Sequence, residues 1–160
     1  LLDLGRIEEM DFAPLDLRDP VREALRLVET QRKRKGLVVH LCGLEAACSV
    51  RGDQSLLQEA ITALLQNAIE AGRENGRIRI SVERLALERV VRVVIEDDGR
   101  GIAEADLERV FQPFFTTKSE GTGLGLSAAL RILQKHAGTL EAHSDGEGLG
   151  ARFTLSLPSA

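Results

Sequence analysis

Aromatic residues and cysteines are scarce in this chain of 160 residues, which contains no tryptophan, no tyrosine, five phenylalanines and two cysteines. Cys42 and Cys48 have neither a CxxC spacing nor a histidine partner, so we expect reduced core thiols rather than a disulfide or a metal site. No apolar run approaches the roughly 20 residues of a membrane span, and no secretory leader is visible. The net charge of −4 gives no general attraction to nucleic acid or anionic membrane. These absences predict a cytoplasmic domain that contacts neither nucleic acid nor a membrane.

The composition that remains, 43% hydrophobic and 29% charged residues, suits one well-packed domain. Apolar residues at the start of the chain have the spacing of the last turns of an amphipathic helix. We therefore expect residues 1–10 to be the tail of a preceding dimerisation helix or linker, and residues 11–160 to form the domain.

Hydrophobic periodicity and turn residues predict alternating helices and strands. A helix is expected from Asp19, as N-cap before Pro20, to a basic run that ends before Gly36. That basic run is either a nucleic-acid patch or, as we favour, a set of cations at a helix C-terminus. The other expected helices follow Asp53 and cover 103–109 and 124–136, and the expected strands cover 37–42, 47–50, 77–84, 89–97, 139–143 and 151–157.

These elements predict an α/β fold: a two-layer α/β sandwich whose mixed, mostly antiparallel sheet is covered on one side by three helices. In the strand at 89–97, alternation places Asp97 on the apolar face and Asp98 on the other. A carboxylate at the mouth of a core is costly unless a donor meets it. Asp97-Asp98-Gly99-Arg100-Gly101 taken alone is equally typical of a tight turn that binds nothing.

A second glycine-rich segment, Gly121-Thr122-Gly123-Leu124-Gly125-Leu126, leads directly into the expected helix at 124–136. Bare backbone at a helix start can hold phosphates, because free N–H groups and the positive helix end face the ligand. The irregular stretch from Phe111 to Gly123 is typical of a functional or mobile loop. It contains Thr116-Thr117-Lys118 and three of the five phenylalanines, Phe111, Phe114 and Phe115.

Together with Asn67-Ala68-Ile69-Glu70-Ala71, these segments match four sequence motifs, the N, G1, F and G2 boxes, in the same order. These are the motifs of the catalytic ATP-binding domain of bacterial sensor histidine kinases, which the chain resembles from about Phe12 to Pro158. The resemblance implies the Bergerat-type ATP-binding fold. It also implies ATP and Mg²⁺ as cofactors and transfer of the ATP γ-phosphoryl group to a histidine on a separate dimerisation domain. ATP or ADP and that domain would be direct partners, a response regulator an indirect one, and this chain alone would be monomeric.

The resemblance also implies roles for individual residues. Asn67 would hold Mg²⁺, and Lys118 would contact the γ-phosphate unless it is solvated surface, so these two are the candidate catalytic residues. Asp97 would accept the exocyclic amine of adenine, and Ile102 would form a pocket wall. The candidate nucleotide-binding residues are Asn67, Ala71, Asp97, Gly99, Gly101, Ile102, Thr116, Thr117, Lys118, Gly121, Thr122, Gly123, Leu124, Gly125, Leu126 and Ala151.

The chain departs from the family pattern at two positions. Ala63 stands where the ATPase branches of the superfamily carry a water-activating glutamate, and Ala151 stands where threonine is common in the last glycine box, Gly148-Leu149-Gly150-Ala151. Two other interpretations stay open: an ATP-driven clamp of the gyrase or chaperone type, which Ala63 disfavours, and a scaffold that binds without catalysis.

The remaining aromatic residues and the histidines are less specific. The phenylalanines either belong to the core or form an exposed patch that docks on another helix, with core packing expected for at least one. None of His40, His136 and His143 has the context of a phosphoacceptor. We interpret His136, near a helix C-terminus, as a partner of the helix dipole.

Overall fold

The computed structural model describes residues 10–115 and 125–160. The expected tail at the start of the chain, apart from Met10, and the segment Thr116–Leu124 lie outside the described residues. The elements, in chain order, are β1 (Ala13–Asp16), α2 (Arg18–Leu27), α3 (Glu29–Lys35), β2 (Val38–Cys42), β3 (Ser49–Gly52), α4 (Gln54–Ala71), β4 (Arg77–Leu85), β5 (Val90–Asp97), α5 (Glu104–Leu107), α6 (Gly125–Lys135), β6 (Thr139–His143) and β7 (Ala151–Pro158).

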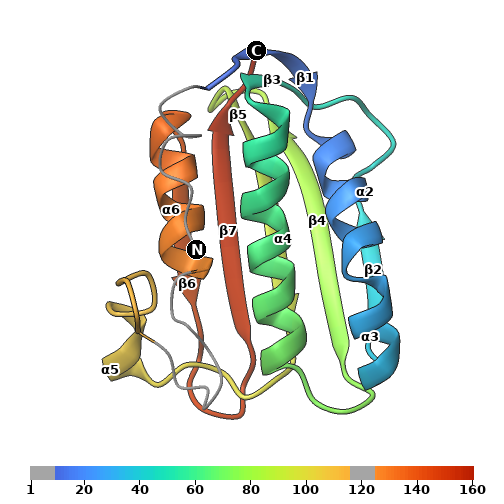
Figure 1. Cartoon of the computed structure of the whole chain (residues 1–160), viewed down its shortest axis with the longest axis vertical. Coiled ribbons are helices and arrows are strands. Elements are labelled where there is room, and N and C mark those ends of the chain that lie inside the picture. The colour runs from blue at the N-terminus through green and yellow to red at the C-terminus, as the bar shows by residue number, and fades with distance from the viewer. Residues whose placement is uncertain (1–9, 116–124) are drawn as a thin grey trace.

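A five-stranded sheet in the order β2-β4-β5-β7-β6 forms one layer of the molecule. The β2–β4 pair is parallel and the other pairs are antiparallel. Helices α2, α4 and α6 lie side by side over one face of this sheet (Figure 1). The two-layer sandwich with a mixed, mostly antiparallel sheet is therefore confirmed. A separate two-stranded sheet, β1-β3, was not predicted in full, since β1 carries no clear apolar alternation.

The central helix α4 forms as its sequence predicts. The Asp53 side chain caps it by accepting the N–H of Leu56 at 3.1 Å. Its apolar stripe is buried against the sheet, where the inward residues of β4 and β5 are buried as well. The buried stripe consists of Leu56, Leu57, Ala60, Ile61, Leu64, Leu65, Ala68 and Ile69.

The helix expected from Asp19 to the basic run is interrupted. It begins at Arg18, with Leu17 rather than Asp19 in the N-cap position, and it breaks at Val28, whose φ of −101° and ψ of 5° are not helical. Asp19 lies in the first turn, where its charge still complements the helix dipole. The stop at Gly36 is confirmed by its left-handed φ of 73°.

The basic run lies at a helix C-terminus, as in the interpretation that we favour: its cations occupy the last turn of α3, and one of them also binds the last turn of α4. Lys35 donates from Nζ to the carbonyl oxygens of Ile69 at 2.8 Å and Glu70 at 3.0 Å, in the last turn of α4. Arg32 pairs with Glu29 and donates to the Leu37 carbonyl at 2.8 Å. The two cations therefore tie α3 to α4 and to the start of β2.

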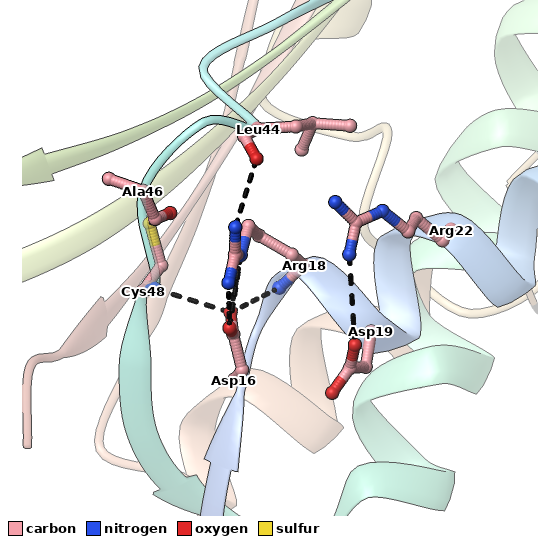
Figure 2. Close-up of polar contacts among 7 residues, drawn as sticks. All are labelled: Asp16, Arg18, Asp19, Arg22, Leu44, Ala46 and Cys48. Carbon is pink, nitrogen blue, oxygen red and sulfur yellow. Dashed lines mark hydrogen bonds and ion pairs between the residues drawn. The ribbon is translucent and has the colours of Figure 1, made fainter.

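A charged clasp, Asp16 with Arg18, joins β1, β3 and the start of α2 (Figure 2). The Arg18 guanidinium forms a two-pronged pair with the Asp16 carboxylate, with 2.6 Å between Nη2 and Oδ2, and donates to the Leu44 carbonyl at 3.0 Å. Asp16 also accepts the backbone N–H of Cys48 at 3.2 Å. The hydrogen bonds from Arg18 lower the pKa of Asp16 to about 2.

Strand β2 departs from its expected pattern. Leu37 is buried just before the strand, but Leu41 is 46% exposed and Val38 is 49% exposed. Strand alternation places Leu37 and Leu41 on the same face, yet only Leu37 is buried; β2 is an edge strand of the sheet. Both cysteines are free, with Cys48 buried and Cys42 partly exposed, so only Cys48 is a core thiol. Among the helices of the described residues, none has the length and apolar character needed to cross a membrane.

Candidate nucleotide-binding site

Several candidate residues meet where the C-terminal ends of α4 and β5 approach the start of β7. The N–H of Arg100 donates to the Ala71 carbonyl at 2.9 Å, which holds the turn after β5 against the last turn of α4. The N–H of Gly150 donates to the Gly99 carbonyl at 3.1 Å and holds the same turn against the loop before β7. In Figure 1 this junction lies at the lower end of the sandwich.

Asp97 is the buried acid of this junction, with 9% of its surface exposed. Its Oδ1 accepts the N–H of Gly99 at 2.9 Å, whereas Oδ2 is buried and has no hydrogen-bond partner in the part of the chain that the structure describes. Burial raises the pKa of Asp97, an effect that the Gly99 N–H opposes. A buried carboxylate oxygen is costly without a donor, so the site suits a ligand that brings an N–H group.

Asp98 has the opposite environment, as the alternation predicted. It is exposed, and its Oδ1 accepts the N–H of Arg77 at 3.0 Å at the start of β4. The two neighbouring acids therefore do different things: Asp98 fixes the end of a strand pair, and Asp97 points into the interior.

Glycines at 99 and 101 are required by the backbone of the protein itself. A Cβ at Gly99 would lie 1.9 Å from the Ala71 carbonyl oxygen. Gly101 has a φ of +70°, and a Cβ there would lie 2.1 Å from the Gly146 carbonyl oxygen. These contacts explain both glycines, and close approach of a purine to them stays a prediction.

Ile102 and Ala151 lie at the edge of this junction. Ile102 is half-buried and packs against the core. Ala151 is 8% exposed and is the cross-strand register partner of Asp97. A residue directly opposite on an antiparallel strand shares the same face, so Ala151 lies beside the carboxylate, and its backbone N–H, like that of Gly99, opposes the effect of burial on the pKa of Asp97.

Asn67 lies one turn before Ala71 on α4 and is half-buried. Further back on α4, Ala63 lies beside the start of α6, since its Cβ is 4.0 Å from where a Cβ of Gly125 would be. Leu126 packs against the core and anchors this end of α6. The predicted metal helix and the last glycine of the predicted phosphate segment are thus neighbours.

The side-chain donors at this site fit Mg²⁺ only if nucleotide phosphates supply further ligands. In the described ranges, no three His, Cys, Asp or Glu side chains gather as a metal cluster. Mg²⁺ keeps several waters and takes few protein ligands, so the amide oxygen of Asn67 with nucleotide phosphates would suffice. Seven further candidates, Thr116, Thr117, Lys118, Gly121, Thr122, Gly123 and Leu124, lie outside the described residues.

The phenylalanines divide between core and surface. Phe111 packs edge-on against the buried Phe153, with ring centroids 6.0 Å apart, which confirms core packing for one of the three. Phe114 is 74% exposed, and the Arg109 guanidinium lies 4.9 Å from the ring centroid of Phe115. Phe114 is therefore an exposed aromatic side chain, whereas Phe111 belongs to the core.

His136 bonds a carbonyl oxygen in the last turn of α6, as expected of a residue near that helix C-terminus, and it also binds the start of a second helix. It is 4% exposed, its Nδ1 lies 2.7 Å from the Ile132 carbonyl, and its Nε2 accepts the N–H of Asp53 at 3.0 Å. Those bonds require the neutral Nδ1–H tautomer, and burial lowers the pKa of His136. The ring bridges the end of α6 to the start of α4, a role that no sequence spacing indicates.

Comparison with known proteins agrees with this geometry. The family model described as histidine kinase-, DNA gyrase B-, and HSP90-like ATPase matches residues 52–160. Sensor histidine kinase ZraS of Klebsiella oxytoca is 32% identical over 158 residues, which cover 99% of this chain and 34% of ZraS. Sporulation kinase A of Bacillus subtilis (strain 168) is 33% identical over 144 residues, which cover 90% of this chain and 23% of that kinase.

Solved structures give the same result. The catalytic domain of histidine kinase ThkA, in a nucleotide-free form, aligns with a TM-score of 0.83 and 33% identity over 93% of this chain and 96% of that one. ThkA in complex with the response regulator protein TrrA aligns with a TM-score of 0.79 and 29% identity over 94% of this chain and 42% of that one.

The fold and these matches define the class as an ATP-binding α/β sandwich. The chain belongs to the family of histidine kinase-, DNA gyrase B- and HSP90-like ATPases, and within it to the catalytic ATP-binding domains of sensor histidine kinases. It spans about a third of the length of the first curated relatives, 34% of ZraS.

Proposed function

We propose that this chain binds Mg·ATP and presents its γ-phosphoryl group to a histidine on a separate helical domain of its parent protein, in the cytoplasm. The observation that carries the proposal is the buried Asp97 Oδ2 without a partner among the described residues, at the junction of α4, β5 and β7. The exocyclic amine of adenine is a donor of the kind that this oxygen needs.

Each end of the nucleotide would meet a different part of the chain. Asp97 would accept from adenine, with Ile102, Ala71 and Ala151 around the ring and the turn at Gly99 and Gly101 beside it. Asn67 and the segment from Thr116 to Leu126 would hold the phosphates, where backbone N–H groups at the start of α6 complement their charge. A bound Mg²⁺ would supply charge neutralisation on the phosphates, with Asn67 as its protein ligand.

The neighbourhood of Ala63 supports transfer over hydrolysis. Its methyl group lies beside the start of α6, where the phosphates are proposed to bind. A methyl group cannot accept a proton from water, so Ala63 cannot serve as the general base of hydrolysis. Positioning and charge neutralisation would then supply the catalysis that this chain contributes, and the acceptor domain would supply the nucleophile. The solved complex of ThkA with a response regulator supports a regulator as the further, indirect partner.

The test is phosphoryl transfer with radiolabelled ATP. The chain alone should bind Mg·ATP, hydrolyse it very slowly and not label itself. Given the helical domain of its own parent, it should produce a phosphate linkage that is acid-labile and alkali-stable, as expected of phosphohistidine. Asn67→Ala should abolish transfer, whereas Gln66→Ala, which alters the adjacent exposed amide on α4, should not.

Other outcomes would select the competing functions. Rapid ATP turnover by the chain alone would favour an ATPase clamp. An acid-stable product would indicate a serine or threonine acceptor. Failure to bind nucleotide would leave the scaffold interpretation. Circular dichroism of Asn67→Ala separates loss of metal binding from loss of fold.

A further inference from the structure

Ser144, in the loop between β6 and β7, makes hydrogen bonds that the sequence pattern did not predict. Its hydroxyl oxygen accepts the N–H of Ile102 at 3.0 Å and the N–H of Gly146 at 3.2 Å, and the hydroxyl donates to the Gly150 carbonyl at 2.6 Å. A hydroxyl offers one donor and two acceptor lone pairs, so all its hydrogen-bonding capacity is used.

These bonds lie at the centre of a junction between two loops. One loop carries Asp97 to Ile102, and the other runs from Ser144 to Ala151. Around Ser144, the Gly150 N–H donates to the Gly99 carbonyl at 3.1 Å and the Gly148 N–H donates to the Arg100 carbonyl at 2.6 Å. The Ser144 side chain adds a hydrogen bond to each loop: it accepts from Ile102 on the first loop and donates to Gly150 on the second loop.

Close backbone packing makes the junction sensitive to small shifts. A Cβ at Gly150 would lie 2.1 Å from the Asp97 carbonyl oxygen, so the second loop lies directly on the backbone of the buried acid. A Cβ at Gly101 would meet the Gly146 carbonyl equally closely, at 2.1 Å. A displacement of the second loop is therefore transmitted to Asp97 and Ile102.

We propose that Ser144 is a positioning residue for the adenine side of the nucleotide site: its hydroxyl holds Ile102 and Gly150 so that Asp97 and Ile102 stay in binding geometry. This inference rests on the proposed nucleotide function. The hydrogen bonds of Ser144 lie within the two loops at the adenine side of the site, so it acts on nucleoside affinity and leaves the transfer step unchanged.

Loss of the hydroxyl would lower the population of the binding-competent loop. Apparent affinity falls in proportion to that population, and the loss of this bonded hydroxyl is expected to weaken binding about three- to tenfold. The factor should be the same for adenosine, ADP and ATP, because each shares the adenine contacts and they differ only in phosphates.

The experiment measures dissociation constants of adenosine, ADP and Mg·ATP by calorimetry for the wild-type chain, Ser144→Ala and Ser144→Cys. The cysteine variant keeps the side-chain volume but replaces the hydroxyl by a weak hydrogen-bonding group, so it should behave like Ser144→Ala. Ser156→Ala is the matched control, because Ser156 is also half-buried but lies far along β7 from the site. In the full parent protein, Ser144→Ala should raise the KM for ATP by the same factor with kcat unchanged.

Several results would overturn the inference. These are unchanged affinities in Ser144→Ala, wild-type affinity in Ser144→Cys, a larger effect on ATP than on adenosine, or a fall in kcat at saturating ATP. Thermal unfolding without ligand checks that the variants fold; a variant that binds poorly because it is unfolded at the assay temperature would also count against a positioning role. Failure of the proposed function itself is distinguishable, since the wild-type chain would then bind none of the three ligands.

Discussion

Two adjacent acids, Asp97 and Asp98, show that a shift of one position at the end of a strand changes the environment of a carboxylate. Asp97 turns inward, loses hydration and keeps one oxygen without a partner among the described residues, while Asp98 stays exposed and accepts the Arg77 N–H. The alternation of β5 predicted this difference, because successive side chains of a strand point to opposite faces. The orphaned oxygen itself was not predictable, since it depends on which N–H groups the turn at Gly99 brings close.

We predict that Asp97→Asn weakens ATP binding roughly ten- to a hundredfold, because it removes a charged hydrogen-bond acceptor. Asp98→Asn is the matched control: the amide oxygen of asparagine can still accept the Arg77 N–H, so affinity should change little. Calorimetric titration with Mg·ATP measures both. Equal losses in the two variants would contradict the separate roles assigned to these acids.

At the scale of elements, helices α4 and α6 are joined by a neutral histidine. His136 donates to its own helix at Ile132 and accepts from Asp53, the residue that caps α4, and Phe12 stacks on the ring with centroids 4.9 Å apart. Because burial lowers its pKa in the folded state, the unfolded chain binds the proton more readily. Stability from this group is therefore complete above the ordinary histidine pKa of about 6.5 and is lost as pH falls below it.

We predict that His136→Gln lowers stability at pH 7.5 by about 1–2 kcal/mol, through lost stacking and packing, but reduces the further loss between pH 7.5 and pH 5.5. Glutamine can accept the Asp53 N–H and does not titrate. Urea unfolding at the two pH values measures the difference. The wild-type pH dependence in His136→Gln would exclude His136 as its source.

The Asp16–Arg18 clasp gives a second prediction at this scale. Its carboxylate has a pKa of about 2, below the ordinary 3.8, so its stabilisation is present above pH 3.8 and is lost as pH falls towards 2. Asp16→Asn should cost about 1–2 kcal/mol at pH 7 and flatten the acid dependence in that range. Asp19→Asn, beside it in Figure 2, should have little effect, because Asp19 and Arg22 are 3.9 Å apart and both side chains are more than half exposed, at 56% and 51%. Equal losses measured by urea unfolding would contradict the distinction.

The elements also show where sequence reasoning succeeded and where it stopped. The helix α4 and the strands β4 and β5 were predicted, because a single hydrophobic period specifies each of them and Asp53 marks the start of α4. The break at Val28 and the exposure of Leu41 were not, since both depend on how neighbouring elements pack. For the same reason the bridging by His136 and Ser144 was missed: each bond joins segments far apart in the chain, such as His136 and Asp53.

At the scale of the whole molecule, the described surface has no concentrated apolar face. Of its large exposed hydrophobic residues, only Val38 and Leu41 share a helix or strand; the set is Phe12, Leu27, Val38, Leu41, Leu87, Phe114 and Leu149. The edge strands of the main sheet, β2 and β6, have five residues each and offer short edges for pairing. A stable dimer interface needs a larger contiguous apolar area than scattered side chains provide.

We therefore predict that this chain is a monomer in solution at micromolar concentrations, with or without Mg·ATP. Sedimentation equilibrium should give the mass of one chain, independent of concentration. If a dimer forms instead, Leu41→Lys and Phe114→Lys would locate it. Loss of the dimer in Leu41→Lys would indicate pairing through the β2 edge. Loss in Phe114→Lys would indicate pairing through the exposed ring of Phe114. A stable dimer of either kind would contradict the monomer.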